Sequence, residues 1–105
     1  MKITRGTTPT ININVKSEID LAAISVIWVY ITQDNRVVID KELKDCTLDV
    51  ENRVISLELT QEDTLALKVG EGLFQIRLLM IDGLALATKA SRITVQEVYK
   101  DGVIA

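Results

Sequence analysis

Histidine is missing from this sequence of 105 residues, and cysteine, proline and aromatic side chains are scarce. With Cys46 as its one cysteine, the chain cannot form a disulfide framework. A structural zinc site needs a cluster of Cys or His ligands, so we expect no metal or other cofactor. No apolar run approaches the roughly 20 residues of a membrane-spanning helix. Residues 1–6 lack the apolar core of a signal peptide, so we expect synthesis in the host cytoplasm without export by the usual route.

An excess of charge of one sign is also missing. Twelve Lys and Arg stand against 15 Asp and Glu, for a net charge of −3. Nucleic-acid binders usually carry a basic stripe, and the arginines here are scattered, so we expect no nucleic-acid partner. Hydrophobic residues make up 48% of the chain, which is too many for intrinsic disorder.

The chain is rich in β-branched side chains, with thirteen isoleucines, eleven valines and ten threonines. Such side chains are stiff at their first torsion and pack well on a pleated surface. Alternation and turn signals predict the strands. They cover residues 2–7, 10–16, 23–32, 36–43, 47–50, 53–59, 73–81 and 84–98, the last broken near 89–91.

Residues 60–67 change period. Thr60 can cap a helix, and the acids that follow favour the positive end of its dipole. The pattern predicts an all-β, immunoglobulin-like two-sheet sandwich of seven or eight strands with one short helical turn, at a corner where the chain crosses between sheets. We expect one domain over residues 1–98 and a tail over 99–105. Asp82 and Gly83 predict a tight hairpin with positive φ at both turn positions.

The hairpin around residues 33–35 can close in two registers. A two-residue loop puts Asp40 and Glu42 on the same face as the aliphatic row of the preceding strand. A three-residue loop, residues 33–35, pairs Ile31 with Val37 and leaves both carboxylates in solvent. Burying an unpaired carboxylate costs several kcal/mol, so we expect the three-residue loop, with Lys41 at the rim of the core face and Val38 outside.

This register turns Trp28 and Tyr30 outward. Leu79 and Ile81 should also face outward on the penultimate strand, which we expect to neighbour the Trp28 strand. A contiguous apolar patch on the surface of a domain usually marks a contact site; the alternative is that the tail or the first strand covers it. The candidate interface comprises Trp28, Tyr30, Leu79 and Ile81, with Leu84 or Leu86 beside them.

The expected core is aliphatic and comes from the inward positions of the strands, with Ile19 or Leu21 tucked in from the connection between them. It comprises Ile11, Ile13, Val15, Ile27, Val29, Ile31, Ile39, Ile55, Leu57 or Leu59, Phe74, Ile76, Leu78 and Val95.

Residues suited to catalysis are not arranged for it. Without histidine, Cys46 lacks a base that could activate a thiolate, and we expect a buried structural thiol. The spacing of the acids suggests neither a general acid–base pair nor a calcium loop. Gly70 and Gly72 are not followed by a helix or a Lys-Ser/Thr pair, so they form no phosphate cradle. We expect a protein that is not an enzyme and has no small-molecule substrate.

Four segments together resemble a known group of proteins. They are residues 3–11 (Ile-Thr-Arg-Gly-Thr-Thr-Pro-Thr-Ile), 59–65 (Leu-Thr-Gln-Glu-Asp-Thr-Leu), 72–77 (Gly-Leu-Phe-Gln-Ile-Arg) and the turn at Asp82 and Gly83. A Trp/Tyr-rich strand with a polar turn lies between the first and the second. Their order is similar to the immunoglobulin-like N-terminal domain of phage baseplate upper proteins and to small prophage-encoded proteins of Gram-positive bacteria.

The resemblance implies a structural or assembly protein of a phage tail or baseplate, found in the host cytoplasm and in the virion. Its partners would be copies of itself or other virion components, and no catalytic residue is implied. The departure is that no fibre, stalk or receptor-binding region follows in this chain. Two other classes stay open: a free-standing bacterial immunoglobulin-like interaction module, such as an adaptor or regulator, and an exported adhesin domain, which would need a signal peptide.

Overall fold

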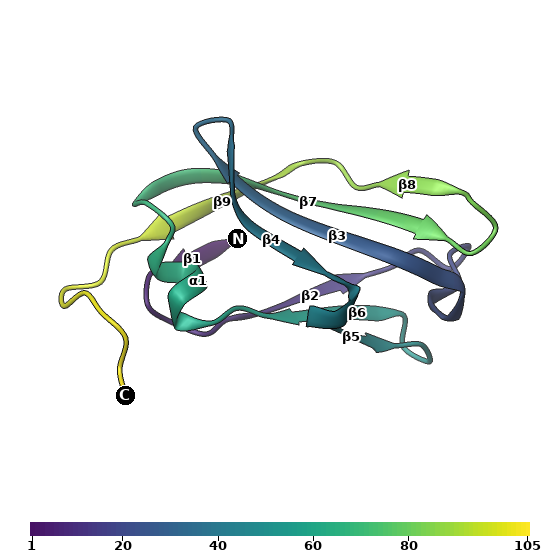
Figure 1. Cartoon of the computed structure of the whole chain (residues 1–105), viewed down its shortest axis with the longest axis horizontal. Helices are drawn as coiled ribbons and strands as arrows, with labels where there is room; N and C mark the ends of the chain where they lie inside the picture. The colour runs from purple at the N-terminus through teal and green to yellow at the C-terminus, as the bar shows by residue number, and fades with distance from the viewer.

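The structure, a computed structural model that describes all 105 residues, consists of two β-sheets packed face to face (Figure 1). The larger sheet has the order β1 (Lys2–Thr4), β9 (Ser91–Gln96), β7 (Gly70–Met80), β3 (Ile24–Gln33) and β4 (Arg36–Glu42), with β8 (Ala85–Ala87) also paired to β7. The smaller sheet has the order β2 (Thr10–Asn14), β6 (Val54–Glu58) and β5 (Cys46–Asp49).

This connectivity is that of an immunoglobulin-like sandwich. Strands β2, β6 and β5 correspond to B, E and D of that fold, and β9, β7, β3 and β4 to G, F, C and C′. β1 joins the larger sheet parallel to β9. The predicted all-β two-sheet sandwich is confirmed, with nine strands instead of seven or eight. The expected break in the last strand separates β8 from β9.

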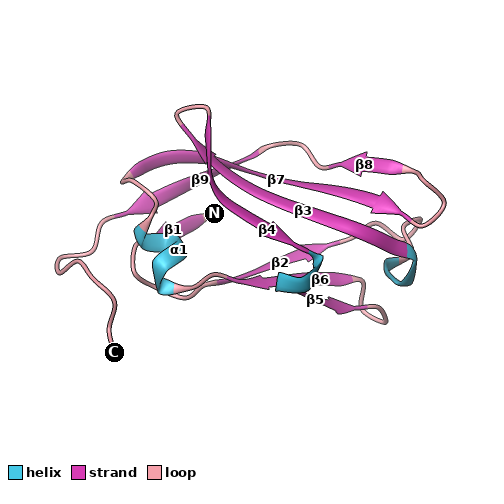
Figure 2. Cartoon of the chain, in the orientation of Figure 1, coloured by secondary structure: helices cyan, strands magenta, loops and turns pink.

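The first expected strand is shorter than predicted, because Gly6 turns the chain with a φ of +78°. Helical structure is limited to α1 (Gln61–Leu65) and two 3₁₀ turns, η1 (Leu21–Ala23) and η2 (Leu43–Asp45) (Figure 2). As predicted, α1 lies where the chain crosses between sheets, from β6 to β7. The Thr60 side chain accepts a hydrogen bond from the Asp63 N–H, and the Asp63 carboxylate accepts one from the Thr60 N–H. No helix is long and apolar enough to cross a membrane.

The β3–β4 hairpin closes in neither of the two registers considered. Its loop is the two-residue one, with positive φ at Asp34 and Asn35, as in a type I′ turn. A β-bulge then shifts the pairing, so that Ile31 stands opposite Ile39. The extra residue restores the inward and outward facing that the three-residue loop would have given.

The bulge has two consequences for side chains. Asp40 and Glu42 reach solvent, as predicted. We expected Val37 to face the core. Instead it pairs with Thr32 on the outer side and is 55% exposed. Val38, expected outside, packs against the core instead. The predicted facing of the β4 side chains is therefore confirmed from Ile39 onward and wrong for Val37 and Val38.

The β7–β8 hairpin also differs from the prediction. Met80 pairs with Leu84 across three residues, and only Gly83 has positive φ, +92°. The Asp82 carboxylate caps the turn by accepting a hydrogen bond from the Leu84 N–H at 3.0 Å. With Asp82 in ordinary backbone conformation, only the last loop residue must be left-handed.

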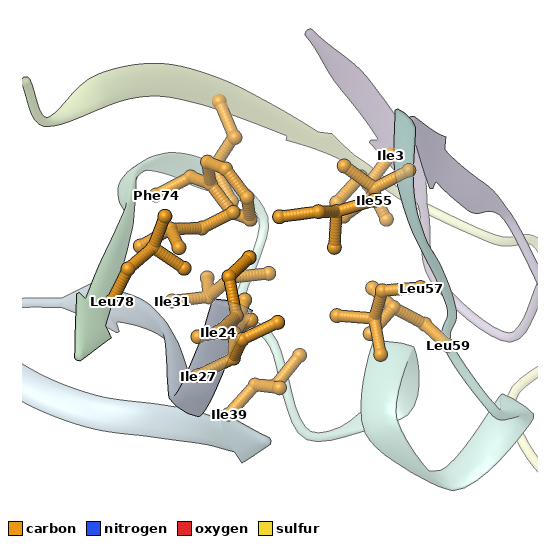
Figure 3. Packing of buried hydrophobic residues seen from close by; sticks show 14 of the residues in the cluster. Ile3, Ile24, Ile27, Ile31, Ile39, Ile55, Leu57, Leu59, Phe74 and Leu78 are labelled. Carbon is orange, nitrogen blue, oxygen red and sulfur yellow. The ribbon is translucent and has the colours of Figure 1, made fainter. Parts of the chain in front are cut away.

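A core of 18 buried apolar side chains fills the space between the sheets, and Figure 3 shows the β6 residues pointing toward those of the larger sheet. Prediction and structure agree on Ile11, Ile27, Val29, Ile31, Ile39, Ile55, Leu57, Leu59, Phe74, Ile76, Leu78 and Val95. Leu21 is the residue of the connection that is fully buried. Ile13 and Val15 are only half-buried, because no strand stands beside β2 at that end.

We expected Gln33 in the hairpin loop, but it ends β3 with its side chain buried. Its amide donates to the Lys68 carbonyl and accepts from the Lys68 N–H, both at 2.8 Å. The side chain thus pairs with the backbone as another strand would, and it joins the segment after α1 to the hairpin.

Candidate interface on the larger sheet

Strand pairing places the predicted interface residues on the outer face of the larger sheet. β3 and β7 are neighbours, as expected, with Trp28 opposite Arg77. Trp28 is 40% exposed and Leu79 38% exposed, whereas Tyr30 is half-buried. Ile81 is 74% exposed but lies in the loop after β7, where its N–H donates to the Ala23 carbonyl.

The aromatic side chains are held in a fixed arrangement. The ring centroids of Trp28 and Tyr30 lie 6.2 Å apart in an edge-to-face geometry, with 66° between the ring planes. The Arg77 guanidinium carbon lies 5.2 Å from the Trp28 ring centroid, within range of a cation–π contact. Such contacts leave few torsions to freeze when the surface meets another protein.

Leu73 and Arg77 also lie on this outer face, although neither was among the expected interface residues. Both follow from the alternation that placed Leu79 outside, because residues two apart on a strand share a face. Leu86, one of the two expected companions, faces the other way, opposite Leu78 on the inner side of β7, whereas Leu84 is exposed in the turn. We call Trp28, Tyr30, Leu73, Arg77 and Leu79 the aromatic face.

Charged side chains of opposite sign flank the aromatic face. On one side, Asp40 and Glu42 of β4 stand opposite Tyr30 and Trp28. On the other side, Arg92 of β9 stands opposite Leu73, and Arg77 lies four residues farther along β7 on the same face. None of the four charged residues forms an ion pair within the chain. We call Asp40 and Glu42 the acidic strip and Arg77 with Arg92 the basic strip; the exposed Glu71 lies beside Arg92 on the same face.

The C-terminal tail is bound beside α1 rather than over this face (Figure 1). The Gln61 amide accepts a hydrogen bond from the Ile104 N–H at 2.8 Å and donates one to its carbonyl at 3.1 Å. β1, the other expected cover, lies beyond β9 in the plane of the sheet. No segment of the chain lies over the aromatic face.

Arg5 anchors the corner of the molecule where α1 and the tail meet. The sequence around Arg5 does not reveal this role. Its guanidinium donates to the carbonyls of Leu65 and Leu67, at 2.9 and 2.8 Å, and forms ion pairs with Glu97 and Asp101. The Val98 N–H and the Arg5 guanidinium together lower the pKa of the Glu97 carboxyl. Arg5 therefore joins the end of α1 to the start of the tail.

The remaining candidates for chemistry lie apart. Cys46 is half-buried at the start of β5, where its thiol donates to the Glu42 carbonyl at 3.4 Å. Burial, with the nearby Asp45 carboxylate, raises the pKa of this thiol, which opposes formation of a nucleophilic thiolate. No group of three or more His, Cys, Asp or Glu side chains comes together in a way that could hold a metal ion.

Comparison with known proteins bears on the fold alone. No protein-family model and no curated protein sequence matches the chain. Among solved structures, the chain is similar to CopC from Methylosinus trichosporium OB3b, with 16% identity and a TM-score of 0.57 over 95% of this chain and 87% of that one. At this identity, the likeness supports the β-sandwich and says nothing of function.

Proposed function

We propose that this chain is a non-enzymatic structural or assembly protein of phage or prophage type, and that it self-associates through the aromatic face. The assignment to a phage rests on the resemblance of the four sequence segments. Self-association rests on one observation: an aromatic surface without cover lies between an acidic strip and a basic strip.

The order of charges across the face suits a second copy of the chain. A two-fold axis parallel to the strands, passing between β3 and β7, would lay the acidic strip of each copy over the basic strip of the other. Such an interface is self-complementary, as closed homodimers require. The complementary potentials would favour this orientation over others.

Trp28, Tyr30 and Arg77 would supply most of the binding energy. Tryptophan, tyrosine and arginine are enriched among residues that dominate interfaces, because they bury a large area in a well-packed centre. Here Trp28 contacts both Tyr30 and Arg77. Asp40 and Arg92 at the edges would set orientation more than affinity.

Sedimentation velocity of the Trp28→Ala and Tyr30→Ala variants tests self-association. We expect Trp28→Ala to weaken assembly by about 2 kcal/mol or more, or roughly thirtyfold, with little change in the melting temperature measured by circular dichroism. Tyr99→Ala is the matched control, because Tyr99 is a fully exposed aromatic of the tail. A parent protein that stays monomeric at high concentration contradicts self-association.

Charge reversal tests the arrangement of the two copies. Asp40→Lys combined with Glu42→Lys should weaken the dimer, and adding Arg92→Glu should restore part of the loss. Failure of Arg92→Glu to restore any affinity contradicts the two-fold arrangement, even if the dimer exists.

The phage assignment has a separate test. Genes for tail, tape-measure, holin or lysin proteins beside the gene for this chain would support it. Neighbouring genes of a bacterial regulatory or adhesion system would favour the adaptor or adhesin class instead.

A further inference from the structure

The smaller sheet ends at β2, and the outer edge of β2 has no partner strand. The Val15 N–H donates to the Arg53 carbonyl, and the Leu59 N–H to the Pro9 carbonyl, so odd-numbered residues of this segment bond toward β6. Because bonding direction alternates along an antiparallel strand, the backbone groups of Thr10, Asn12 and Asn14 point away from the sheet. These groups are available to another strand.

A groove of about 620 Å³ runs along this edge, between the end of β2 and β8 of the other sheet. Nine of its 14 lining residues are hydrophobic. The half-exposed core residues Ile13 and Val15 form one wall, and Leu86 lies on the other. The larger sheet does not close over the groove, because its last strand is broken between β8 and β9.

The topology indicates what would fill this position. In the seven-stranded immunoglobulin sandwich, the sheet that contains strands B, E and D has a fourth strand, A, beside B. Here β1 pairs in the other sheet, so nothing stands beside β2. The edge also lacks the features that normally prevent strand addition: β2 and β8 contain no charged residue and no proline, whereas the β4 edge has a bulge and charged residues.

We infer that this open edge accepts an extended segment of a partner protein, which pairs with β2 as an added strand and places alternate side chains in the groove. Strand addition of this kind gains affinity from backbone hydrogen bonds and specificity from side-chain pockets. The segment should have Val, Ile or Leu at every second position. An acidic residue should follow the apolar positions, because Lys16 and Lys89 at the groove outnumber Glu18.

A second copy of the chain does not supply such a segment. Its alternating strands are already packed into its own core. Its tail carries Val103 and Ile104 next to each other, so only one of them could enter the groove. The inferred edge site lies between the two sheets, on the inner side of β7 and β8, whereas the aromatic face is on the outer side of the larger sheet. The inference therefore does not depend on the proposed self-association.

Two labelled synthetic peptides of the same composition provide the probe. The first, Thr-Val-Ser-Ile-Thr-Leu-Ser-Val-Asp, alternates apolar and polar residues; in the second, the apolar residues are grouped. By fluorescence anisotropy, we expect the alternating peptide to bind saturably and the grouped one at least about tenfold more weakly. Hydrogen exchange of the full chain should show new protection at the Asn12 and Asn14 amides when the first peptide is bound.

Adjacent residues of β8 give a matched pair of variants. Leu86→Lys puts a charge in the groove and should weaken the alternating peptide by about tenfold or more. Ala85→Lys, on the opposite face of the same strand beside Leu79, should leave binding unchanged. Leu84→Lys, at an exposed position of the groove wall, provides the same test if Leu86→Lys fails to fold.

Several results would overturn the inference. They are absence of binding, equal binding of the two peptides, and binding that neither Leu84→Lys nor Leu86→Lys weakens. A dimer that survives Trp28→Ala but is lost in Asn12→Pro would also overturn it, since a second copy would then occupy the β2 edge.

Discussion

The two lateral sides of the sandwich are built differently. On one side, the chain itself crosses from β4 to β5 through η2, and the Lys41 ammonium forms an ion pair with the Asp63 carboxylate at 3.0 Å. On the other side, β2 and β8 face each other without a connection, and the groove lies between them. The first side is closed by covalent and ionic links, and the second is open.

The sequences of the edge strands correspond to this difference. The β4 segment carries Asp40, Lys41 and Glu42, and its bulge twists the edge out of register. The β2 segment, Thr-Ile-Asn-Ile-Asn, has no charge and no bulge. Natural sheets protect the edges that must stay unpaired, so the unprotected β2 edge fits a surface that meets another strand.

The largest expected effect compares one core isoleucine from each side. Ile39→Ala, on the closed side, should lower the free energy of unfolding by about 2–4 kcal/mol, because a buried side chain is removed and a cavity remains. Ile13→Ala, beside the groove, should cost about half of that or less, since Ile13 is already half-exposed. Denaturant unfolding of both variants measures the two losses; equal losses would contradict the description of the β2 side as open.

A smaller effect is expected at the ion pair that closes the first side. Burial alone raises the pKa of Asp63, but the hydrogen bond from the Thr60 N–H and the contact with Lys41 outweigh it, so that the pKa lies below its usual value. A lowered pKa in the folded state stabilises the fold above the unfolded-state pKa of about 3.9, and this stabilisation is lost as pH falls through the folded-state pKa.

Asp63→Asn should therefore cost about 1 kcal/mol at neutral pH, because asparagine can still accept from the Thr60 N–H but loses the charge that attracts Lys41 and the N-terminus of α1. The deficit should narrow below about pH 4, where the parent carboxylate becomes protonated. Unfolding measured from pH 7 to pH 3 tests this, with Asp82→Asn at an exposed turn as the control. If the difference in the free energy of unfolding between the parent and Asp63→Asn stays constant with pH, the charge of Asp63 contributes nothing to stability.

The smallest effect is expected at Cys46, also on the closed side. Cys46→Ser should change stability by less than about 1 kcal/mol, because the residue is half-buried and serine can also donate to the Glu42 carbonyl. Since the thiol pKa is raised, alkylation at pH 8 should be slower in the folded chain than in denaturant.

A chelator should leave the melting temperature unchanged, and a drop of several degrees would reveal a metal that the sequence does not predict.

The two hairpins illustrate the limits of prediction from sequence. Their turn types are interchanged relative to expectation: the loop at Asp34 has two residues and the one at Asp82 has three. Burial cost fixes which side chains must face the core, and this argument placed Trp28 and Asp40 outside. It cannot distinguish a longer loop from a bulge, because both shift the facing of side chains by one position.

The candidate sites were predictable to different degrees. Trp28, Tyr30 and Leu79 could be placed from alternation along their strands, and Leu73 and Arg77 follow from the same rule. The two charge strips could not be predicted from alternation, because they lie on opposite sides of the aromatic face and depend on the positions of β4 and β9 in the sheet. The open edge of β2 required the pairing of β1 with β9, a contact between residues about 90 positions apart.

The sequence by itself determined most of the strands, their inward faces except at Val37 and Val38, and the position of α1, because these depend on side-chain alternation and local capping, which act over a few residues. Tertiary structure alone decided which edges stay free, which charges lie across the aromatic face from one another, and that Arg5 holds the tail against α1. Those features depend on which strand pairs with which, and that choice is made by long-range packing of the whole core rather than by any local segment.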